Sequence, residues 1–223
     1  MNRSVLNALK AVAVLVAITV VSVGLLAVCN MFFPKYVPKL DMDTAKKINS
    51  IAKACDSDET AFREGYIVLL NEDEYGVSIV DYNKNHKSRR AEILAVYGEP
   101  KGFNTGAFIV ESAAEGRDST VVILCAYKDG ALIGATVKKQ NESYFEKLPD
   151  DLFGSVLGSV GDVDLEANLG KTYATISLGA VNRALNMSNA FASAHGEKIR
   201  EAISVRSKSE SRGENDKKGV RLD

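Results

Sequence analysis

The first 34 residues contain a long apolar run that most constrains what this chain can become. From Ala11 to Pro34 there is no charged side chain in 24 residues. At about 1.5 Å per residue, a helix of this length spans a hydrocarbon core of about 30 Å. A cleaved signal peptide has an apolar region of only about 7–15 residues and a small-residue cleavage site, whereas this run ends in Met31-Phe32-Phe33. The sequence therefore predicts an uncleaved transmembrane anchor over residues 1–34.

A second interpretation of the same segment stays open. Leu26-Ala27-Val28-Cys29 resembles a bacterial lipobox, which would make Cys29 a lipidated N-terminus. Val28 fits this motif poorly, because the position before the cysteine normally holds Gly, Ala or Ser. We therefore favour the anchor and keep the lipoprotein as the alternative.

Charges on the two sides of the run predict its orientation. Arg3 and Lys10 make the short N-terminal flank purely positive, whereas the other flank combines lysines with Asp41 and Asp43. Positively charged flanks tend to stay on the cytoplasmic side of a membrane. We expect a single-pass protein of the cell membrane, with its N-terminus inside and its main domain extracytoplasmic.

Composition excludes several classes of function. Lys+Arg number 28 against 29 Asp+Glu, for a formal net charge of −1, whereas a nucleic-acid binder shows a basic excess clustered on one face. We therefore expect no nucleic-acid partner. Cys29, Cys55 and Cys125 are too few and too scattered for a disulfide framework or a zinc cluster. With only His86 and His195 in the chain, we expect neither a histidine-based metal site nor a catalytic triad.

The segment after the apolar run predicts a stalk and the first strands. Residues 43–54 place their apolar side chains on one helical face, so we expect a stalk helix and linker over residues 35–64. Residues 65–70 and 75–80 have the composition of two strands, joined by an acidic turn. Residues 84–90 (KNHKSRR) predict a basic loop, which is either a solvated turn or a contact with phosphate or lipid headgroups.

The middle of the chain has the clearest strand pattern. A short strand is expected at residues 106–111. The runs TVVILCAYK and ALIGATVK, within residues 120–138, are rich in β-formers and flank Asp129-Gly130, a dipeptide favoured in two-residue hairpins. Cys125 lies inside the first run, so we expect a core residue and not a nucleophile.

The last part of the chain predicts helices and a tail. We expect a short helix around residues 149–157 and a longer one over residues 177–194, with Ser177 as its N-cap. Residues 197–223 are charged and rich in serine, which predicts a disordered tail. The sequence as a whole predicts an α+β fold: one transmembrane helix, then a domain over residues 65–196 with antiparallel hairpins and a C-terminal helix.

Hydroxyl side chains crowd the start of that last helix. Thr172, Thr175 and Ser177 lie within six residues of one another. The first turn of a helix has free N–H groups and the positive end of the helix dipole, which together stabilise a phosphate. The pattern predicts either a phosphate site or only a hydroxyl-rich helix start.

The same segment resembles a known family. Thr172-Tyr173-Ala174-Thr175-Ile176-Ser177, followed by Ala180-Val181 and Ala184-Leu185, is similar to the threonyl-FMN motif of the FMN-binding domain family. That family includes flavin-bearing components of the Rnf electron-transport complex and of the sodium-translocating NADH:quinone reductase. The apolar N-terminus, the hairpin at residues 128–134 and a loop beginning at Glu142, at the place of the family's E-T-P-G loop, extend the resemblance. It covers the anchor and roughly residues 120–195.

The resemblance implies an FMN-binding-type domain with FMN bound covalently, through a phosphoester to Thr175. A flavin transferase that uses FAD and Mg²⁺ would attach it. The other residues implied at the cofactor site are Thr172, Ala174, Ile176, Ser177 and Glu142. The resemblance further implies an electron-transfer subunit, without a catalytic side chain of its own, in an ion-translocating membrane complex of the Rnf type. Its partners would be other membrane subunits, the flavin transferase and membrane lipid.

The sequence departs from the family pattern at several positions. The motif aspartate is Leu169, the motif glycine is Tyr173, and the proline and glycine of the E-T-P-G loop are Tyr144 and Phe145. These differences keep a second interpretation open, a flavin-free anchored domain that serves as a structural or assembly subunit. A lipoprotein sensor or solute binder is a third, and it depends on Cys29 alone.

Overall fold

A computed structural model describes most of the region after the apolar run. It covers residues 42–54, 67–99, 106–169 and 174–218, together with positions 12, 14–16, 18–19 and 22–24. Residues 1–38 and 39–223 form two separate compact units. Within the covered residues, no helix has both the length and the apolar character needed to cross a bilayer. Most of the predicted anchor, including Cys29, lies outside the described residues.

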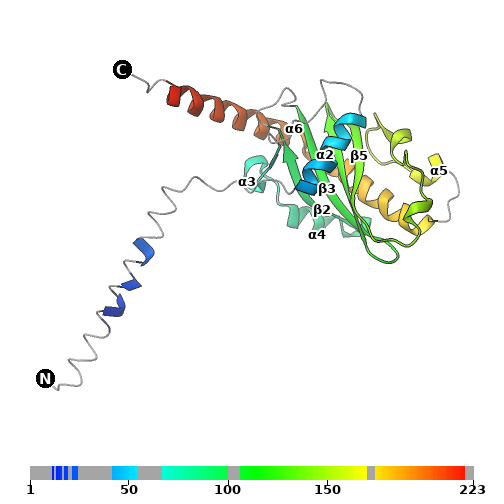
Figure 1. Ribbon diagram of the computed structural model, residues 1–223, viewed down its shortest axis with the longest axis horizontal. Helices are drawn as coiled ribbons and strands as arrows, with labels where there is room; N and C mark the ends of the chain where they lie inside the picture. Colours follow the sequence, from blue (N-terminus) through cyan, green and yellow to red (C-terminus); the bar gives the residue numbers. More distant parts are fainter. Residues whose placement is uncertain are drawn as a thin grey trace. The chain divides into compact units, whose positions relative to one another are not determined.

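The centre of the domain is a five-stranded antiparallel sheet in the order β1-β2-β3-β4-β5 (Figure 1). Its strands are β1 (Val68–Leu69), β2 (Ala91–Gly98), β3 (Ala107–Glu115), β4 (Thr120–Lys128) and β5 (Ala131–Lys139). Each strand pairs with the next one in the sequence. The α+β class and the antiparallel hairpins are therefore confirmed.

The β4–β5 hairpin has the turn that its sequence predicts. Asp129 and Gly130 both have positive φ, 52° and 85°. A two-residue hairpin turn of type I′ requires this conformation at both central positions, which is why Asp-Gly is favoured there. The predicted strand at residues 106–111 is also confirmed, as the first part of the longer β3.

Helices cover both faces of the sheet (Figure 1). The long helix α6 (Thr175–Lys218) packs on β2, β3 and β4, and α2 (Met42–Ala54) packs on β4 and β5. Side chains of β4 alternate between the two faces: Ile123 and Cys125 belong to the core under α6, and Leu124 belongs to the smaller core under α2. This double coverage explains why β4 is a nearly continuous apolar run.

The predicted stalk is wrong in its role, although its helix is confirmed. Ile48 and Ile51 of α2 are almost completely buried against the sheet, together with Tyr97, Ile109 and Leu124. An amphipathic helix must cover its apolar face with something, and the sequence does not say with what. Here the sheet covers it, so α2 belongs to the domain.

The prediction of a second strand at residues 75–80 is wrong. This region forms two short helices, α3 (Glu72–Tyr75) and α4 (Ile79–Asn85). In the described part of the preceding segment, residues 67–70, the strand covers residues 68–69. The acidic stretch starts a helix: the Glu74 carboxylate accepts from the N–H of Asn71 at 2.9 Å. Ser78 then caps α4 by accepting from the N–H of Asp81 at 3.3 Å. The basic segment ends α4 and continues as a 3-10 helix, η1 (Lys87–Arg89).

The region between the hairpin and α6 is irregular. The short helix expected around residues 149–157 is replaced by two single turns of 3-10 helix, η2 (Phe145–Lys147) and η3 (Gly154–Val156). A five-residue helix, α5 (Leu165–Leu169), follows. The segment between η3 and α5 includes Gly158 and Gly161, both with positive φ, which prevents one continuous helix.

The predicted disorder of the tail is wrong for residues 197–218, which continue α6. Ile199, Ala202 and Ile203 are buried in the main core. Their spacing of three and four residues places them on one face of the helix. This apolar stripe is difficult to recognise in the sequence, because charged residues surround it. Residues 219–223 lie outside the described residues.

Candidate functional site

The candidate site is built around the first turn of α6. The helix begins at Thr175, so Ser177 lies inside the first turn and is not the N-cap that the sequence predicts. The first helical bond runs from the N–H of Leu178 to the carbonyl of Ala174 at 2.8 Å. Ala174 and Ser177 are buried, whereas Thr175 and Ile176 are exposed. The hydroxyl-bearing residue implied as the attachment point is therefore accessible.

Other parts of the motif cannot be placed. Thr172 and Tyr173 lie outside the described residues, and Leu169 is the last residue of α5.

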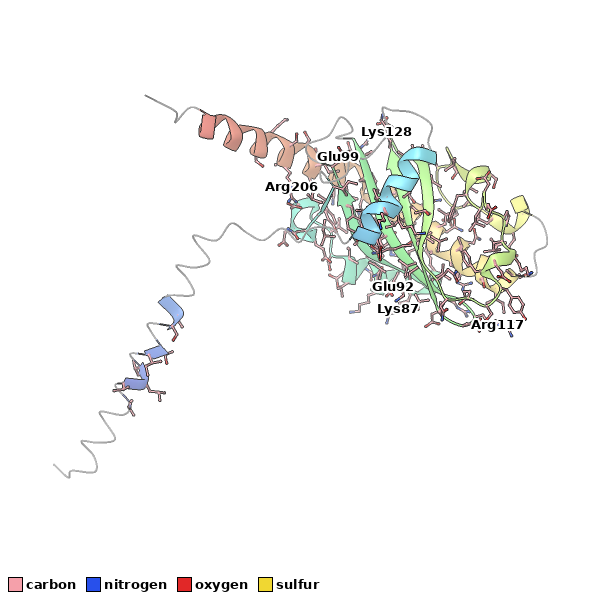
Figure 2. The ribbon with its side chains drawn as sticks, in the orientation of Figure 1. Lys87, Glu92, Glu99, Arg117, Lys128 and Arg206 are labelled. Atoms are coloured by element: carbon pink, nitrogen blue, oxygen red, sulfur yellow. The ribbon has the colours of Figure 1, made fainter. Side chains whose placement is uncertain are left out.

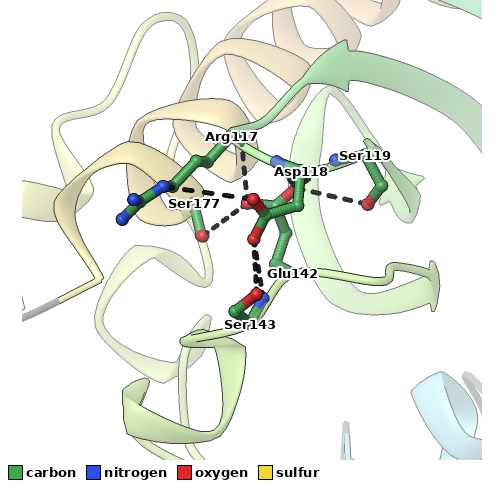
Figure 3. A network of polar contacts seen from close by, with 6 residues as sticks. All are labelled: Arg117, Asp118, Ser119, Glu142, Ser143 and Ser177. Carbon is green, nitrogen blue, oxygen red and sulfur yellow. Dashed lines mark hydrogen bonds and ion pairs between the residues drawn. The ribbon is translucent and has the colours of Figure 1, made fainter.

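A buried carboxylate joins this helix start to two loops (Figure 3). Glu142 Oε2 accepts from the N–H of Arg117 at 2.9 Å, and Oε1 accepts from the N–H groups of Asp118 and Ser119 at 3.0 and 2.7 Å. The hydroxyl of Ser177 donates to Oε2 at 2.8 Å. We call these residues, together with Ser143, the Glu142 cluster. Through it, one side chain holds the β3–β4 turn, the loop after β5 and the start of α6.

The loops are held together by further contacts of the Glu142 cluster. Asp118 Oδ2 accepts from both the N–H and the hydroxyl of Ser143, at 3.0 and 2.7 Å. A methyl group at Gly116 would collide with the Glu142 carboxylate. Because that carboxylate is fixed by several hydrogen bonds, it cannot easily move aside, so this turn requires glycine.

Hydrogen bonding dominates the electrostatics of Glu142. Desolvation by burial raises the pKa of this carboxyl, but the N–H of Arg117, the hydroxyl of Ser177 and the other backbone N–H groups all favour the charged form. Their combined effect lowers the pKa to about 2. A carboxylate that accepts several N–H bonds is expected to behave in this way. Glu142 is therefore a permanent anion at neutral pH.

Two arginines lie near the same helix start. The guanidinium of Arg183 donates to the carbonyl of Glu115 at 2.6 Å, and its Nη1 lies 3.4 Å from the position that a Cβ at Gly179 would occupy. A Cβ at Gly179 would therefore be in ordinary van der Waals contact with this side chain. The Arg117 guanidinium lies 5.6 Å from the centre of the Tyr144 ring, and its Nε lies 4.0 Å from the Asp118 carboxylate, which compensates part of its charge.

A row of asparagines on α6 holds the segment that leads into α5. Asn182, Asn186 and Asn189 make hydrogen bonds of 2.7 to 3.2 Å to the backbone of residues 161–165. Asn186 bonds both the N–H and the carbonyl of Val163, as a neighbouring strand would. This network fixes the chain shortly before it reaches Thr175.

The structure brings together two of the predicted site residues, Glu142 and Ser177, which are 35 positions apart. It also reveals partners that the sequence interpretation missed, the backbone of residues 117–119 and the asparagine row. A signal for the asparagines exists, because their spacing of four and three residues places them on one helical face. Backbone donors give no such signal, since every residue carries an N–H.

Cys125 is a core residue, as predicted. It is fully buried in β4, and burial raises the pKa of its thiol to about 12, so it is not a reactive thiolate. Within the described part of the chain, no group of three or more His, Cys, Asp or Glu side chains is placed to bind a metal ion. Comparison of the chain with family models, with curated proteins and with solved structures finds no match.

Proposed function

We propose that this protein is a membrane-anchored flavoprotein subunit that bears FMN on Thr175 and passes electrons within a membrane redox complex of the Rnf type. The main domain would lie outside the cytoplasm, held by residues 1–34. The observation that carries the proposal is the hydrogen bond between Glu142 and Ser177, because these residues come from two separate segments of the resemblance, the loop after β5 and the motif at the start of α6.

The residues present fit a phosphoester at this position. Thr175 is exposed at the first turn of a 44-residue helix, where the helix dipole and the N–H groups of a first turn favour phosphate. Arg117, in the Glu142 cluster, adds a positive charge that Asp118 partly compensates at 4.0 Å. Glu142 opposes an anion, but five donors from Arg117, Asp118, Ser119 and Ser177 already surround its charge.

Attachment is a balanced transfer reaction. The Oγ1–P bond of Thr175 forms as the pyrophosphate bond of FAD breaks, AMP leaves, and the hydroxyl proton passes to solvent or to a base of the transferase. The flavin itself supplies the redox chemistry, and the protein contributes its position and electrostatics. The Glu142 cluster would hold the first turn of α6 fixed, so that Thr175 is presented in one orientation.

A second candidate function is favoured by the same cluster. Every donor that Ser177 and residues 117–119 direct at this point is already used by Glu142, so the cluster is complete without a ligand. Together with Leu169 and Tyr173, this favours a flavin-free domain that serves as a structural or assembly subunit.

Mass spectrometry after co-expression with a flavin transferase distinguishes the flavoprotein from the flavin-free structural subunit. If FMN is attached, the tryptic peptide from Thr172 to Arg183 gains one FMN-sized mass, and the protein band fluoresces in a denaturing gel. Thr175→Ala removes the oxygen that is esterified and should abolish the adduct, whereas Thr175→Ser should retain it.

Thr136→Ala is the matched control and should leave the adduct intact, because Thr136 follows Gly134-Ala135 but lies in strand β5 and does not start a helix. An unmodified wild-type peptide, under conditions that flavinylate an established member of the FMN-binding family, would reject the flavoprotein and favour the structural subunit.

A further inference from the structure

A separate pocket lies at the end of the sheet formed by the start of β2, the end of β3 and the start of β4. It is open and has a volume of about 890 Å³, within the range of about 300–1,000 Å³ typical of small-ligand sites. Its apolar lining comes from Val80 and from small side chains of β2 and β3, including Ala91 and Ala114. None of its lining residues belongs to the Glu142 cluster.

Three cationic side chains line this pocket: Lys84, Lys87 and Arg90. They come from the end of α4, from η1 and from the residue before β2. Among the described residues, none of the three forms an ion pair within 4.0 Å. Neighbouring Arg89 differs, since it bonds Asp162 at 2.8 Å. The turn therefore uses one of its arginines for structure and leaves the other cations directed at the pocket.

The scaffold of the pocket is rigid. Asn83 accepts from the N–H of Ile93 and donates to its carbonyl, both at 2.8 Å, so it joins α4 to the exposed edge of β2 as a strand would. Arg90 has φ of 51°, a left-handed conformation that is uncommon for a residue other than glycine. Such a conformation persists only where the surrounding structure fixes it, and it often marks a functional position.

We propose that this pocket binds a phosphate group. Lys84, Lys87 and Arg90 supply positive charge and hydrogen-bond donors, and the exposed Thr120 supplies a hydroxyl. Two carboxylates, Glu92 and Glu115, line the same pocket, so three cations against two anions leave an excess of one positive charge. Lys87 and Glu92 can both be seen at this edge of the domain (Figure 2). The phosphate could belong to a lipid headgroup or to a soluble metabolite.

Calorimetric titration of the full chain in a neutral detergent tests the proposal with two probes. Inorganic phosphate represents the soluble source, and glycerophosphoglycerol, the headgroup of phosphatidylglycerol, represents the lipid. Saturable binding of either probe at one equivalent is expected; the tighter of the two identifies the source. Lys84→Gln combined with Lys87→Gln should weaken binding about tenfold or more, since charge-assisted hydrogen bonds are lost.

Two further variants make the test specific. Glu92→Gln should strengthen binding, because it removes a repelling charge from the pocket. Lys147→Gln removes an exposed lysine from η2, outside the pocket, and should change nothing. The proposal is overturned if neither probe binds, or if the lysine double variant binds as tightly as the Lys147→Gln control.

Discussion

The two faces of the sheet are covered by helices that are held in different ways. On one face, α6 buries a large apolar core and adds polar bonds to it: Ser112 donates to the carbonyl of Ala184 at 2.9 Å, and Tyr127 donates to Asn189 at 2.7 Å. On the other face, α2 buries only a small cluster around Ile48 and Ile51. The long helix thus has its position and its rotation fixed along several turns, whereas the buried side chains described for the short one are Thr44, Ile48 and Ile51.

Each of the two regions contains a buried carboxylate, and the two carboxylates have different kinds of hydrogen-bond partner. Glu142, in the region joined to α6, is bound by backbone N–H groups and hydroxyls that belong to two segments, residues 117–119 and the start of α6. Glu111, on the α2 face, is bound by the phenol of Tyr97 at 2.5 Å and by the ammonium of Lys138 at 2.9 and 3.0 Å. Backbone donors stay in place whatever the side chains are, whereas a lysine can be replaced together with its partner. Glu142 therefore holds local geometry, whereas Glu111 is a buried charge that Lys138 compensates.

The largest effect is expected at the end of α6. Ile203→Ala should lower the free energy of unfolding by about 4 kcal/mol, because Ile203 is completely buried against Gly98 and its truncation leaves a cavity. Chemical denaturation measures this loss. Val205→Ala, two residues later but 67% exposed, is the control and should change little. Equal effects of the two variants would mean that this part of α6 is not docked.

A smaller loss is expected on the opposite face. Ile48→Ala should cost about 3 kcal/mol in the same assay, because Ile48 is fully buried but belongs to a smaller cluster. Lys46→Ala, at an exposed position of α2, is the matched control. If α2 were only a stalk, both substitutions would leave the unfolding curve unchanged.

Acid should weaken the Glu142 cluster selectively. The folded-state pKa of Glu142 is about 2, below the ordinary value of 4.5, so its contribution is complete above about pH 5 and is lost as the pH falls towards 2. At about 1.4 kcal/mol per pKa unit, the lowering from 4.5 to about 2 corresponds to about 3 kcal/mol. Denaturation series between pH 7 and pH 2 should show this loss in the wild type, and Glu142→Gln should flatten it. Glu146→Gln, at an exposed neighbour, should keep the wild-type pH profile.

The smallest effect is expected from the Glu111 pair. Lys138→Met leaves Glu111 with only its tyrosine partner and should cost about 1 to 2 kcal/mol, because Lys138 is itself partly exposed. Adding Glu111→Leu should recover most of the loss, since removing both partners of a buried pair is often nearly neutral. A double variant that is less stable than Lys138→Met would show that Glu111 has a structural role comparable to that of Glu142.

Local patterns in the sequence were sufficient to predict the structure of those segments in which a few neighbouring residues determine the backbone conformation. The β4–β5 hairpin follows from Asp129-Gly130, because few other dipeptides adopt positive φ twice. The helix at residues 43–54 follows from apolar periodicity, and the core position of Cys125 follows from the apolar run in which it lies. The α+β class follows from strands joined by a hairpin turn and followed by a C-terminal helix.

Only the tertiary structure decided what each apolar face covers and which polar groups meet. The acidic stretch at residues 71–74 fits a turn or a helix start equally well, and the structure selects the helix. Ile199 and Ile203 stand among charged residues in the sequence, and only the folded sheet shows that their side chains are buried. Ser177 and Glu142 are each ordinary polar residues in the sequence. They become one cluster because the fold brings the backbone donors of the β3–β4 turn and the hydroxyl of Ser177 to a single carboxylate, and backbone donors are the same at every position of the chain.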